Sequence, residues 1–257
     1  MRSKVIGLAA AGATVATLGL AAAAHASPAT VEVAGSSADA DYPFYALAAD
    51  PNPSDPTAMA IQFSVRNASN NIINMGCKQV HAEGNVHGGP VDLDGDAIAT
   101  IQAVSRANTP EGFSHSEWKG CKGPVNLDMT VVPLNDWEIH GYPPVSSGND
   151  VIPGYISGPA GAPLRANVYA TTGSSGCSFE VEGYANGSFD EGNQTLSVNE
   201  TGYTGNLKVV VAGGGSTCLG LVGDGNAANF EGDFVVGDDN AANTKSGITH
   251  FFPINVY

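Results

Sequence analysis

The chain has 257 residues, and its 25 Asp and Glu residues outnumber its 10 Lys and Arg residues, which gives a formal net charge of −15 at pH 7. Such a charge repels phosphate backbones and anionic lipids, so nucleic acid and acidic membranes are poor candidate partners. The length is enough for one large β domain or two small ones.

The first 26 residues have the features of a secretory signal peptide. Arg2 and Lys4 supply a positive n-region, residues 5–23 form an apolar stretch of mostly small residues, and Ala24-His25-Ala26 matches an A-x-A cleavage site. The C-terminal part of the chain has no stretch apolar enough to cross a bilayer. We therefore predict a secreted, extracellular or cell-surface protein without an integral membrane span.

The four cysteines indicate a disulfide framework. Export makes oxidation the expected state, and four cysteines allow three pairings. We favour Cys77–Cys121 with Cys177–Cys218, because each pair flanks one half of the chain that is rich in predicted strands. A structural zinc site is the alternative, but no two cysteines lie within four residues of each other, as such sites usually require.

Alternating apolar and polar residues predict strands along the whole chain after residue 56. Residues 27–56, with five prolines, are predicted as an extended lead-in whose later part joins the first sheet. We predict a single all-β domain over residues 57–257, with two lobes (57–140 and 164–257) as the alternative, because residues 141–163 are rich in Pro and Gly. Ser114–Lys119 is predicted as at most one helical turn. The strands are predicted over 58–65, 79–86, 97–104, 125–132, from 137 onwards, and over 165–170, 179–182, 196–198 and 207–209.

Turn signals separate the strands of the second half. Asn186-Gly187 and Asp224-Gly225 have the sequence of two-residue hairpin turns, and residues 190–193 fit a longer hairpin loop. Many short strands joined by such turns predict an antiparallel β-sandwich or a closed β-barrel with two disulfides.

Several of these segments also resemble a known group of proteins. The residues concerned are Gly176-Cys177, the run EVEGYANGSFDEGNQTLSV, Cys218–Val222 and Asn229–Val236. They are similar to small exported actinobacterial β-rich proteins of unknown function and, more distantly, to the secreted alkane-oxidation activator proteins. The resemblance implies a cysteine-paired, β-rich, extracellular protein. It carries over no catalytic residue, because the shared positions are mostly turns and core residues.

The best metal candidate is the acidic run Asp92-Leu93-Asp94-Gly95-Asp96. Three carboxylates on alternate residues can surround a hard cation, and the glycine lets the chain turn. Ala97 and Ala103 stand where an EF-hand loop requires Gly and Glu, so the prediction is a generic calcium loop at Asp92, Asp94 and Asp96. The alternative is a solvated acidic turn, in which case the protein has no cofactor.

A second candidate is His81-Ala82-Glu83 with His87. On a strand these side chains would share one face, where His81 and Glu83 could hold one metal ion. His-x-Glu also begins the zinc deaminase motif, but the Pro-Cys-x-x-Cys part is missing. An exposed polar strand face without a metal is the favoured alternative.

Aromatic and acidic side chains supply the last candidates. Trp118, Trp137, Tyr142 and Tyr155 could line a sugar or lipid groove, with core packing as the default. Acidic pairs such as Asp136 with Glu138, or Glu180 with Glu182, could serve glycoside hydrolysis, although such pairs arise by chance in an acidic chain.

The function predicted from the sequence is non-enzymatic. We expect an extracellular or cell-surface binding or structural protein, whose partner is a surface polymer or another protein. A secreted hydrolase that acts on carbohydrate is the alternative.

Overall fold

The computed structural model describes residues 28–49, 55, 58–103, 116–145, 150–171, 176–238 and 253–257. The predicted signal peptide lies outside these residues. They form nineteen strands and two short 3-10 helices, which confirms the all-β prediction. None of the helices in this part of the chain is long and apolar enough to cross a membrane.

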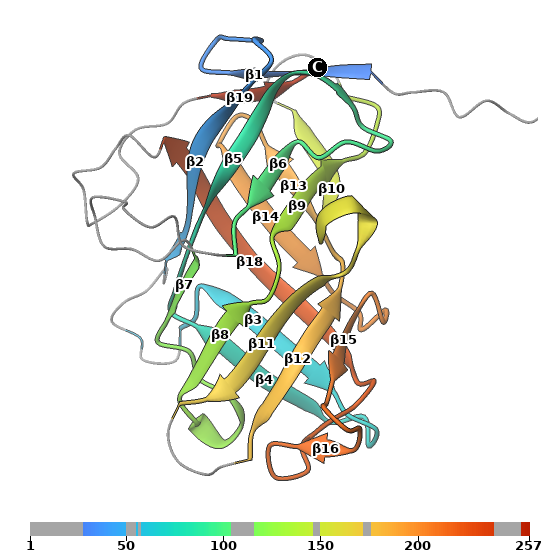
Figure 1. Ribbon diagram of the computed structural model, residues 1–257. Coiled ribbons are helices and arrows are strands. Elements are labelled where there is room, and N and C mark those ends of the chain that lie inside the picture. The colour runs from blue at the N-terminus through green and yellow to red at the C-terminus, as the bar shows by residue number, and fades with distance from the viewer. Residues whose placement is uncertain are drawn as a thin grey trace, which may run out of the picture.

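The elements are numbered along the chain (Figure 1). The strands are β1 (Pro28–Val33), β2 (Ala40–Ala49), β3 (Ile61–Arg66), β4 (Ile72–Cys77), β5 (Gln79–Asp92), β6 (Ala99–Ile101), β7 (Ser116–Lys119), β8 (Met129–Pro133), β9 (Trp137–Gly141), β10 (Val151–Ser157), β11 (Leu164–Ala170), β12 (Ser178–Gly183), β13 (Ala185–Asp190), β14 (Thr195–Glu200), β15 (Leu207–Val210), β16 (Ser216–Thr217), β17 (Val222–Gly223), β18 (Ala227–Asp238) and β19 (Ile254–Val256). The 3-10 helices are η1 (Pro124–Asn126) and η2 (Pro159–Gly161).

The upper half of the molecule in Figure 1 is a closed antiparallel barrel. Its ladders join, in order around the barrel, β2, β5, β6, β9, β10, β13, β14 and β18, and β18 then pairs with β2. Of the two predicted architectures, sandwich and barrel, the structure is the barrel. Closure pairs both sides of every strand in this ring, so the ring has no free sheet edge.

The lower half continues the same strands. Ladders join β8, β11, β12 and β15 and continue through the first part of β18 to β3 and β4. Lys122 spans the remaining distance, because it forms bridges both to Gly76 of β4 and to Asp128 beside β8. The chain therefore runs back and forth between the two halves as one meander, and the long strand β18 belongs to both (Figure 1).

Side chains alternate between the barrel interior and its outer surface, as the pleat of a strand requires. On β10, Ile152 and Ile156 are buried and line the interior, whereas Val151, Pro153 and Tyr155 point outward. The hydrophobic core is thus the inside of the barrel.

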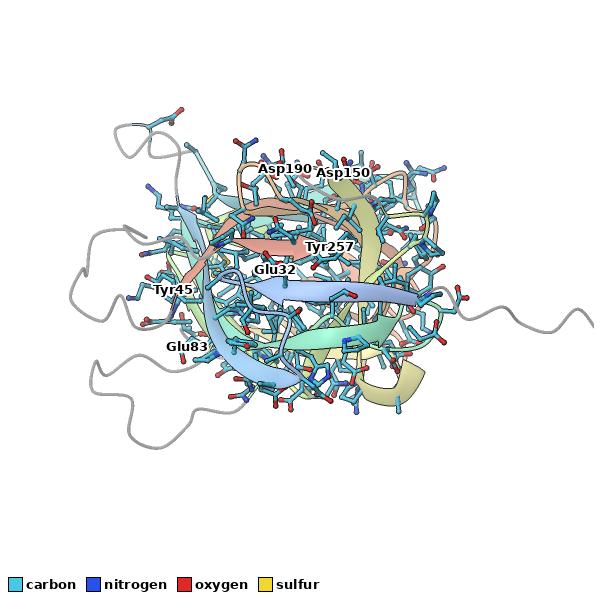
Figure 2. All side chains as sticks on the ribbon, turned by 90° about the horizontal axis from the view of Figure 1, so that it is seen from above. Glu32, Tyr45, Glu83, Asp150, Asp190 and Tyr257 are labelled. Atoms are coloured by element: carbon cyan, nitrogen blue, oxygen red, sulfur yellow. A yellow bond between two sulfur atoms is a disulfide. The ribbon has the colours of Figure 1, made fainter. Side chains whose placement is uncertain are left out.

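The upper end of the barrel is covered by β1 and β19, which pair with each other. Figure 2 views the molecule from this end and shows both strands lying across it. Val31 and Val33 of β1 and Ile254 and Val256 of β19 are buried there. These side chains close the apolar interior at this end.

Two buried polar side chains hold β19 in this position. The Gln194 amide accepts a hydrogen bond from the Ile254 N–H at 2.8 Å and donates one to the Ile254 carbonyl at 3.1 Å. The Glu191 carboxylate accepts hydrogen bonds from the backbone N–H groups of Val256 and Asp150. The turn between β13 and β14 therefore fixes the C-terminal strand through side chains as well as through the β1 ladder.

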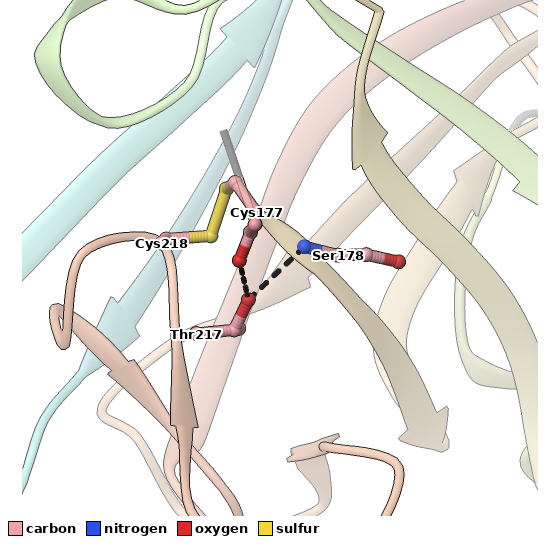
Figure 3. The surroundings of a disulfide bond; sticks show 5 residues. Cys177, Ser178, Thr217 and Cys218 are labelled. Atoms are coloured by element: carbon pink, nitrogen blue, oxygen red, sulfur yellow. Dashed lines mark hydrogen bonds between the residues drawn. A yellow bond between two sulfur atoms is a disulfide. The ribbon is translucent and has the colours of Figure 1, made fainter. Parts of the chain in front are cut away.

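All four cysteines are paired, and the pairs are the predicted ones, Cys77–Cys121 and Cys177–Cys218. Both disulfides lie in the lower half. Figure 3 shows Thr217 beside the second: its hydroxyl donates to the Gly176 carbonyl and accepts a hydrogen bond from the Ser178 N–H at 3.1 Å. Disulfides persist in oxidising compartments, so the pairing indicates that this chain folds in one.

The largest correction concerns residues 141–163. These residues, which are rich in Pro and Gly, were predicted as a linker between two lobes or as a long loop within one domain. They contain the whole of β10, which pairs with β9 on one side and β13 on the other. Strand β10 was not predicted because it contains Pro153 and Gly154, and both residue types are rare inside strands. At position 154 the backbone of β9 comes so close that an added Cβ would lie 2.1 Å from the His140 carbonyl oxygen.

Two further predictions were wrong in detail. Asn186-Gly187 is no hairpin turn but lies inside β13, where Gly187 permits close approach of β14: an added Cβ would lie 2.4 Å from the Ser197 carbonyl oxygen. The predicted helical turn at Ser114–Lys119 is wrong over its described residues, because Ser116–Lys119 form strand β7. The later part of the lead-in, residues 27–56, joins the sheet as β2, as predicted, and its earlier part also contains a strand, β1. The turns at Asp224-Gly225 and after Asp190 are confirmed.

Candidate functional site on the outer face of the barrel

One strip of the outer surface departs from the polar exterior expected of this barrel. The outward side chains of β14 are polar, namely Thr195, Ser197 and Asn199. On β10, the outward residues Val151, Pro153 and Tyr155 are apolar or aromatic. Tyr142, directly after β9, and Tyr184, between β12 and β13, add two further rings beside β10. We call Tyr142, Val151, Pro153, Tyr155 and Tyr184 the tyrosine strip.

Tyr155 lies at the centre of the strip. Its ring centroid is 5.3 Å from that of Tyr142 and 6.3 Å from that of Tyr184. The side chains of Tyr142 and Tyr184 are each 42% exposed, and Val151 is 60% exposed. Scattered exposed apolar residues are ordinary, but rings in mutual contact on one outer face make a candidate interaction surface.

His140 supports Tyr155 from the neighbouring strand. The two residues are directly opposite in the β9–β10 ladder, and their rings stack with centroids 4.7 Å apart and an interplanar angle of 10°. The imidazole is only 5% exposed, and its Nδ1 is 3.2 Å from the Asp96 carbonyl oxygen. Its Nε2 faces the Glu138 carboxylate at 3.5 Å. The ring is therefore held by its Nδ1 contact and by stacking, beside Tyr155 on the neighbouring strand.

The surroundings of Tyr142 favour its neutral phenol. Partial burial raises the pKa of Tyr142 above its ordinary value, and the neighbouring phenols of Tyr155 and Tyr184 raise this pKa further. Glu138 stands at one margin of the strip, where its carboxylate accepts a hydrogen bond from the Ala160 N–H, and Asp190 lies opposite Val151 at the other end. The strip thus offers flat, uncharged ring faces with hydroxyl groups at their edges.

The structure separates the four aromatic residues singled out in the sequence. Tyr142 and Tyr155 belong to the strip. Trp118 and Trp137 instead meet inside the barrel, edge to face, with ring centroids 6.4 Å apart. Both indoles line the cavities of the interior, so they belong to the core and not to a surface groove.

Two residues of this candidate site were not singled out in the sequence. Tyr184 stands between two strands, and His140 occurs in a run with no recognisable motif. The available signal for this site was the spacing Val151-x-Pro153-x-Tyr155. It places three apolar residues on one face of a strand and so could have indicated β10, the central strand of the site. Because this segment was predicted as a linker or loop, the spacing was not interpreted as one face of a strand.

Of the predicted calcium residues, Asp92 ends β5, and Asp94 and Asp96 lie in the turn after it. The Asp96 carboxylate accepts a hydrogen bond from the Asp92 N–H at 3.0 Å, and the Asp92 carboxylate accepts one from the Asp94 N–H at 3.2 Å. Within the ranges that the structure covers, no group of three or more His, Cys, Asp or Glu side chains is arranged to hold a metal ion. Calcium binding at this turn stays a prediction.

The histidine candidate is divided between two environments. His81 and Glu83 lie on β5 with the His81 Nε2 and a Glu83 carboxylate oxygen 3.6 Å apart, and the Tyr45 ring meets the imidazole at 4.4 Å. Both side chains are buried, so the expected exposed polar face is wrong at these two positions. His87 is more exposed and contacts Asp39 and Asp41 instead.

The acidic pairs are engaged in separate contacts. Glu180 forms an ion pair with Arg165, and Glu182 forms one with Lys208 at 3.2 Å. Asp136 accepts a hydrogen bond from the Ala103 N–H at 2.8 Å. These carboxylates therefore tie neighbouring strands and loops together.

The chain was also compared with models of protein families, with curated proteins and with solved structures. None of the three comparisons finds a match. The resemblance to exported actinobacterial proteins stays a prediction.

Proposed function

We propose that this protein is a non-enzymatic extracellular or cell-surface binding protein, and that the tyrosine strip is its binding surface. The observation that carries the proposal is the row of Tyr142, Tyr155 and Tyr184 on one outer face of a closed barrel. The predicted signal peptide and the two disulfides support an extracellular setting.

The proposed ligand is a neutral polysaccharide. A flat ring face attracts the C–H groups of a sugar ring, because the aromatic quadrupole places negative charge on that face, while the tyrosine hydroxyls can exchange hydrogen bonds with sugar hydroxyls. An anionic polymer would meet a protein whose formal net charge is −15, so repulsion disfavours it.

The strip is also prepared for binding. A tyrosine side chain has two rotatable angles and offers a large contact area at low entropic cost. His140, itself buried, restricts the Tyr155 ring further by stacking on it. A surface that is ordered before the ligand arrives loses less free energy on binding.

Retention on insoluble polysaccharide tests the proposal. The chain without residues 1–26 is applied to cellulose and to chitin, and its mobility is measured in gels that contain dextran. We expect retention on at least one neutral polymer and a large loss for Tyr155→Ala. Tyr257→Ala is the matched control, because Tyr257 is 41% exposed but lies at the upper end of the barrel (Figure 2). Equal retention of Tyr155→Ala, or no retention on any neutral polymer, would contradict the proposal.

The same samples distinguish the hydrolase alternative. A binding protein leaves the polymer intact, so no reducing ends should accumulate during prolonged incubation. Their appearance at a rate proportional to protein concentration would favour the enzyme.

A further inference from the structure

Glu200 is a buried acidic residue that has no ion pair. It is the last residue of β14 and is only 1% exposed. None of the ion pairs that the described residues form includes it. Burying a charged group costs free energy unless hydrogen bonds replace its water. A residue that breaks this rule of burial is expected where it supports a functional site.

Four hydrogen-bond donors from three residues surround the Glu200 carboxylate. The Asn186 backbone N–H and side-chain Nδ2 donate to it at 3.1 and 2.7 Å, and the Thr204 hydroxyl donates at 2.6 Å. The Asn206 Nδ2 lies 3.3 Å from each of its two oxygens. The Asn206 carbonyl in turn accepts a hydrogen bond from the Tyr184 N–H at 3.1 Å. Glu200 therefore also supports one residue of the tyrosine strip.

Asn186 is the neighbour of the central ring of the strip. It is directly opposite Tyr155 in the β10–β13 ladder, while His140 is opposite Tyr155 in the β9–β10 ladder. Side chains that are directly opposite in an antiparallel pair share one face of the sheet, with Cβ atoms about 5 Å apart. A sugar residue stacked on Tyr155 is therefore within reach of the Asn186 side chain.

The Glu200 carboxylate also fixes the orientation of the Asn186 amide. An ionised carboxylate only accepts hydrogen bonds, so the Nδ2 of the amide, and not its Oδ1, must face Glu200. The Asn186 Oδ1 accepts no hydrogen bond from the residues that the structure describes. The residue is half-buried, so this oxygen remains open to a ligand on the strip.

We infer that Asn186 is a specificity-determining residue of the tyrosine strip and that Glu200 is its positioning residue. The Asn186 Oδ1 accepts a hydrogen bond from a hydroxyl at the edge of the sugar ring that stacks on Tyr155. A phenol face attracts any sugar face with exposed C–H groups, whereas an acceptor in a fixed position distinguishes sugars by their hydroxyl groups. The inference rests on the proposed function, because it assigns a polar contact to the same surface.

Titration calorimetry with three soluble probes, cellohexaose, chitohexaose and isomaltohexaose, tests the inference. We expect the chain without residues 1–26 to bind at least one of them. Asn186→Ala should weaken that binding about fivefold, which is the effect of one hydrogen bond. Asn199→Ala is the matched control, because Asn199 is exposed on β14 and lies opposite Glu231 instead of a residue of the strip. We expect it to bind as tightly as the unchanged chain.

A second pair of variants separates the acceptor from its orientation. Asn186→Asp keeps oxygen atoms at this position but places a second carboxylate against Glu200, so repulsion displaces them. We expect this variant to bind as weakly as Asn186→Ala. Adding Glu200→Gln restores a hydrogen bond between the two side chains, with donor and acceptor exchanged, and should recover the affinity. Denaturant unfolding reports whether each variant folds, and Asn186→Asp alone decides the point if the double variant does not.

The outcomes distinguish this inference from the proposed function. If Tyr155→Ala loses binding of a probe but Asn186→Ala binds it as tightly as the unchanged chain, only the inference is overturned. An equal loss in Asn186→Ala and Asn199→Ala would overturn it as well. Equal affinity of Asn186→Asp and the unchanged chain would show that Glu200 does not position the residue. If the unchanged chain binds none of the probes, the inference is overturned together with the proposed function.

Discussion

The imidazole of His140 lies parallel to the phenol ring of Tyr155, with 4.7 Å between ring centroids. One residue is buried and the other belongs to the tyrosine strip, and the β9–β10 ladder places them opposite each other. The fold therefore restricts the orientation of a surface ring through a buried ring beside it on the neighbouring strand.

The first prediction concerns this pair. His140→Ala removes both the stacked ring and the hydrogen bond to the Asp96 carbonyl, so we expect a loss of about 2 kcal/mol in the free energy of unfolding. His140→Phe keeps a ring beside Tyr155 and should lose about 1 kcal/mol. Denaturant titration measures both values. Polysaccharide retention should fall in His140→Ala and persist in His140→Phe, and equal retention in the two variants would show that the stacking is irrelevant to binding.

The second prediction concerns the buried amide that holds β19. Gln194→Ala leaves the N–H and carbonyl of Ile254 without these partners, and each unsatisfied buried group costs about 1–3 kcal/mol. We expect faster hydrogen exchange in β1 and β19 but unchanged exchange in β11 and β12. Uniformly faster exchange would mean that the upper end does not open separately from the barrel.

The third prediction concerns the disulfides. Their sequence separations are 44 and 41 residues, and a cross-link that closes a loop of that size stabilises by ~4 kcal/mol in the chain-entropy model. The double substitutions Cys77→Ser/Cys121→Ser and Cys177→Ser/Cys218→Ser should therefore destabilise the protein to a similar extent. Thermal unfolding of the two variants measures this. A variant as stable as the unchanged chain would contradict the role of that disulfide.

The fourth prediction concerns pH. Burial and the neighbouring phenols raise the pKa of Tyr142 above the ordinary value of 10.0, so the folded state favours its neutral form. This contribution to stability is complete below pH 10 and is lost as the pH rises through the folded-state pKa. A difference titration between the unchanged chain and Tyr142→Phe, followed by phenolate absorbance, should have its midpoint above 10. A midpoint at or below 10 would contradict the packing described for this ring.

The sequence predicted the fold better than the site. Alternation revealed β5, β12 and β14, and the spacing of cysteines among predicted strands favoured the correct pairs, because both signals depend on local periodicity and compartment. It could not decide between sandwich and barrel, since closure depends on the pairing of β18 with β2, which are distant in the chain.

The site was harder because its parts come from separate segments. Tyr142, Tyr155 and Tyr184 are brought together only when β9, β10 and β13 pair, and no local pattern encodes that register. Pro153 and Gly154 also kept β10, the central strand of the site, from being predicted. Tyr142 and Tyr155 were found as aromatic candidates, but nothing in the sequence separated them from Trp118 and Trp137, whose side chains turn inward.

A titration followed by nuclear magnetic resonance tests the central claim most directly. The isotope-labelled chain is titrated with a soluble oligosaccharide of the neutral polymer that retains it best, and backbone amide shifts are recorded. The account predicts that the shifted amides cluster on β9, β10 and the junction of β12 with β13, around Tyr155, and that Tyr155→Ala abolishes the shifts. Shifts centred on another face of the barrel, and unaffected by Tyr155→Ala, would contradict it.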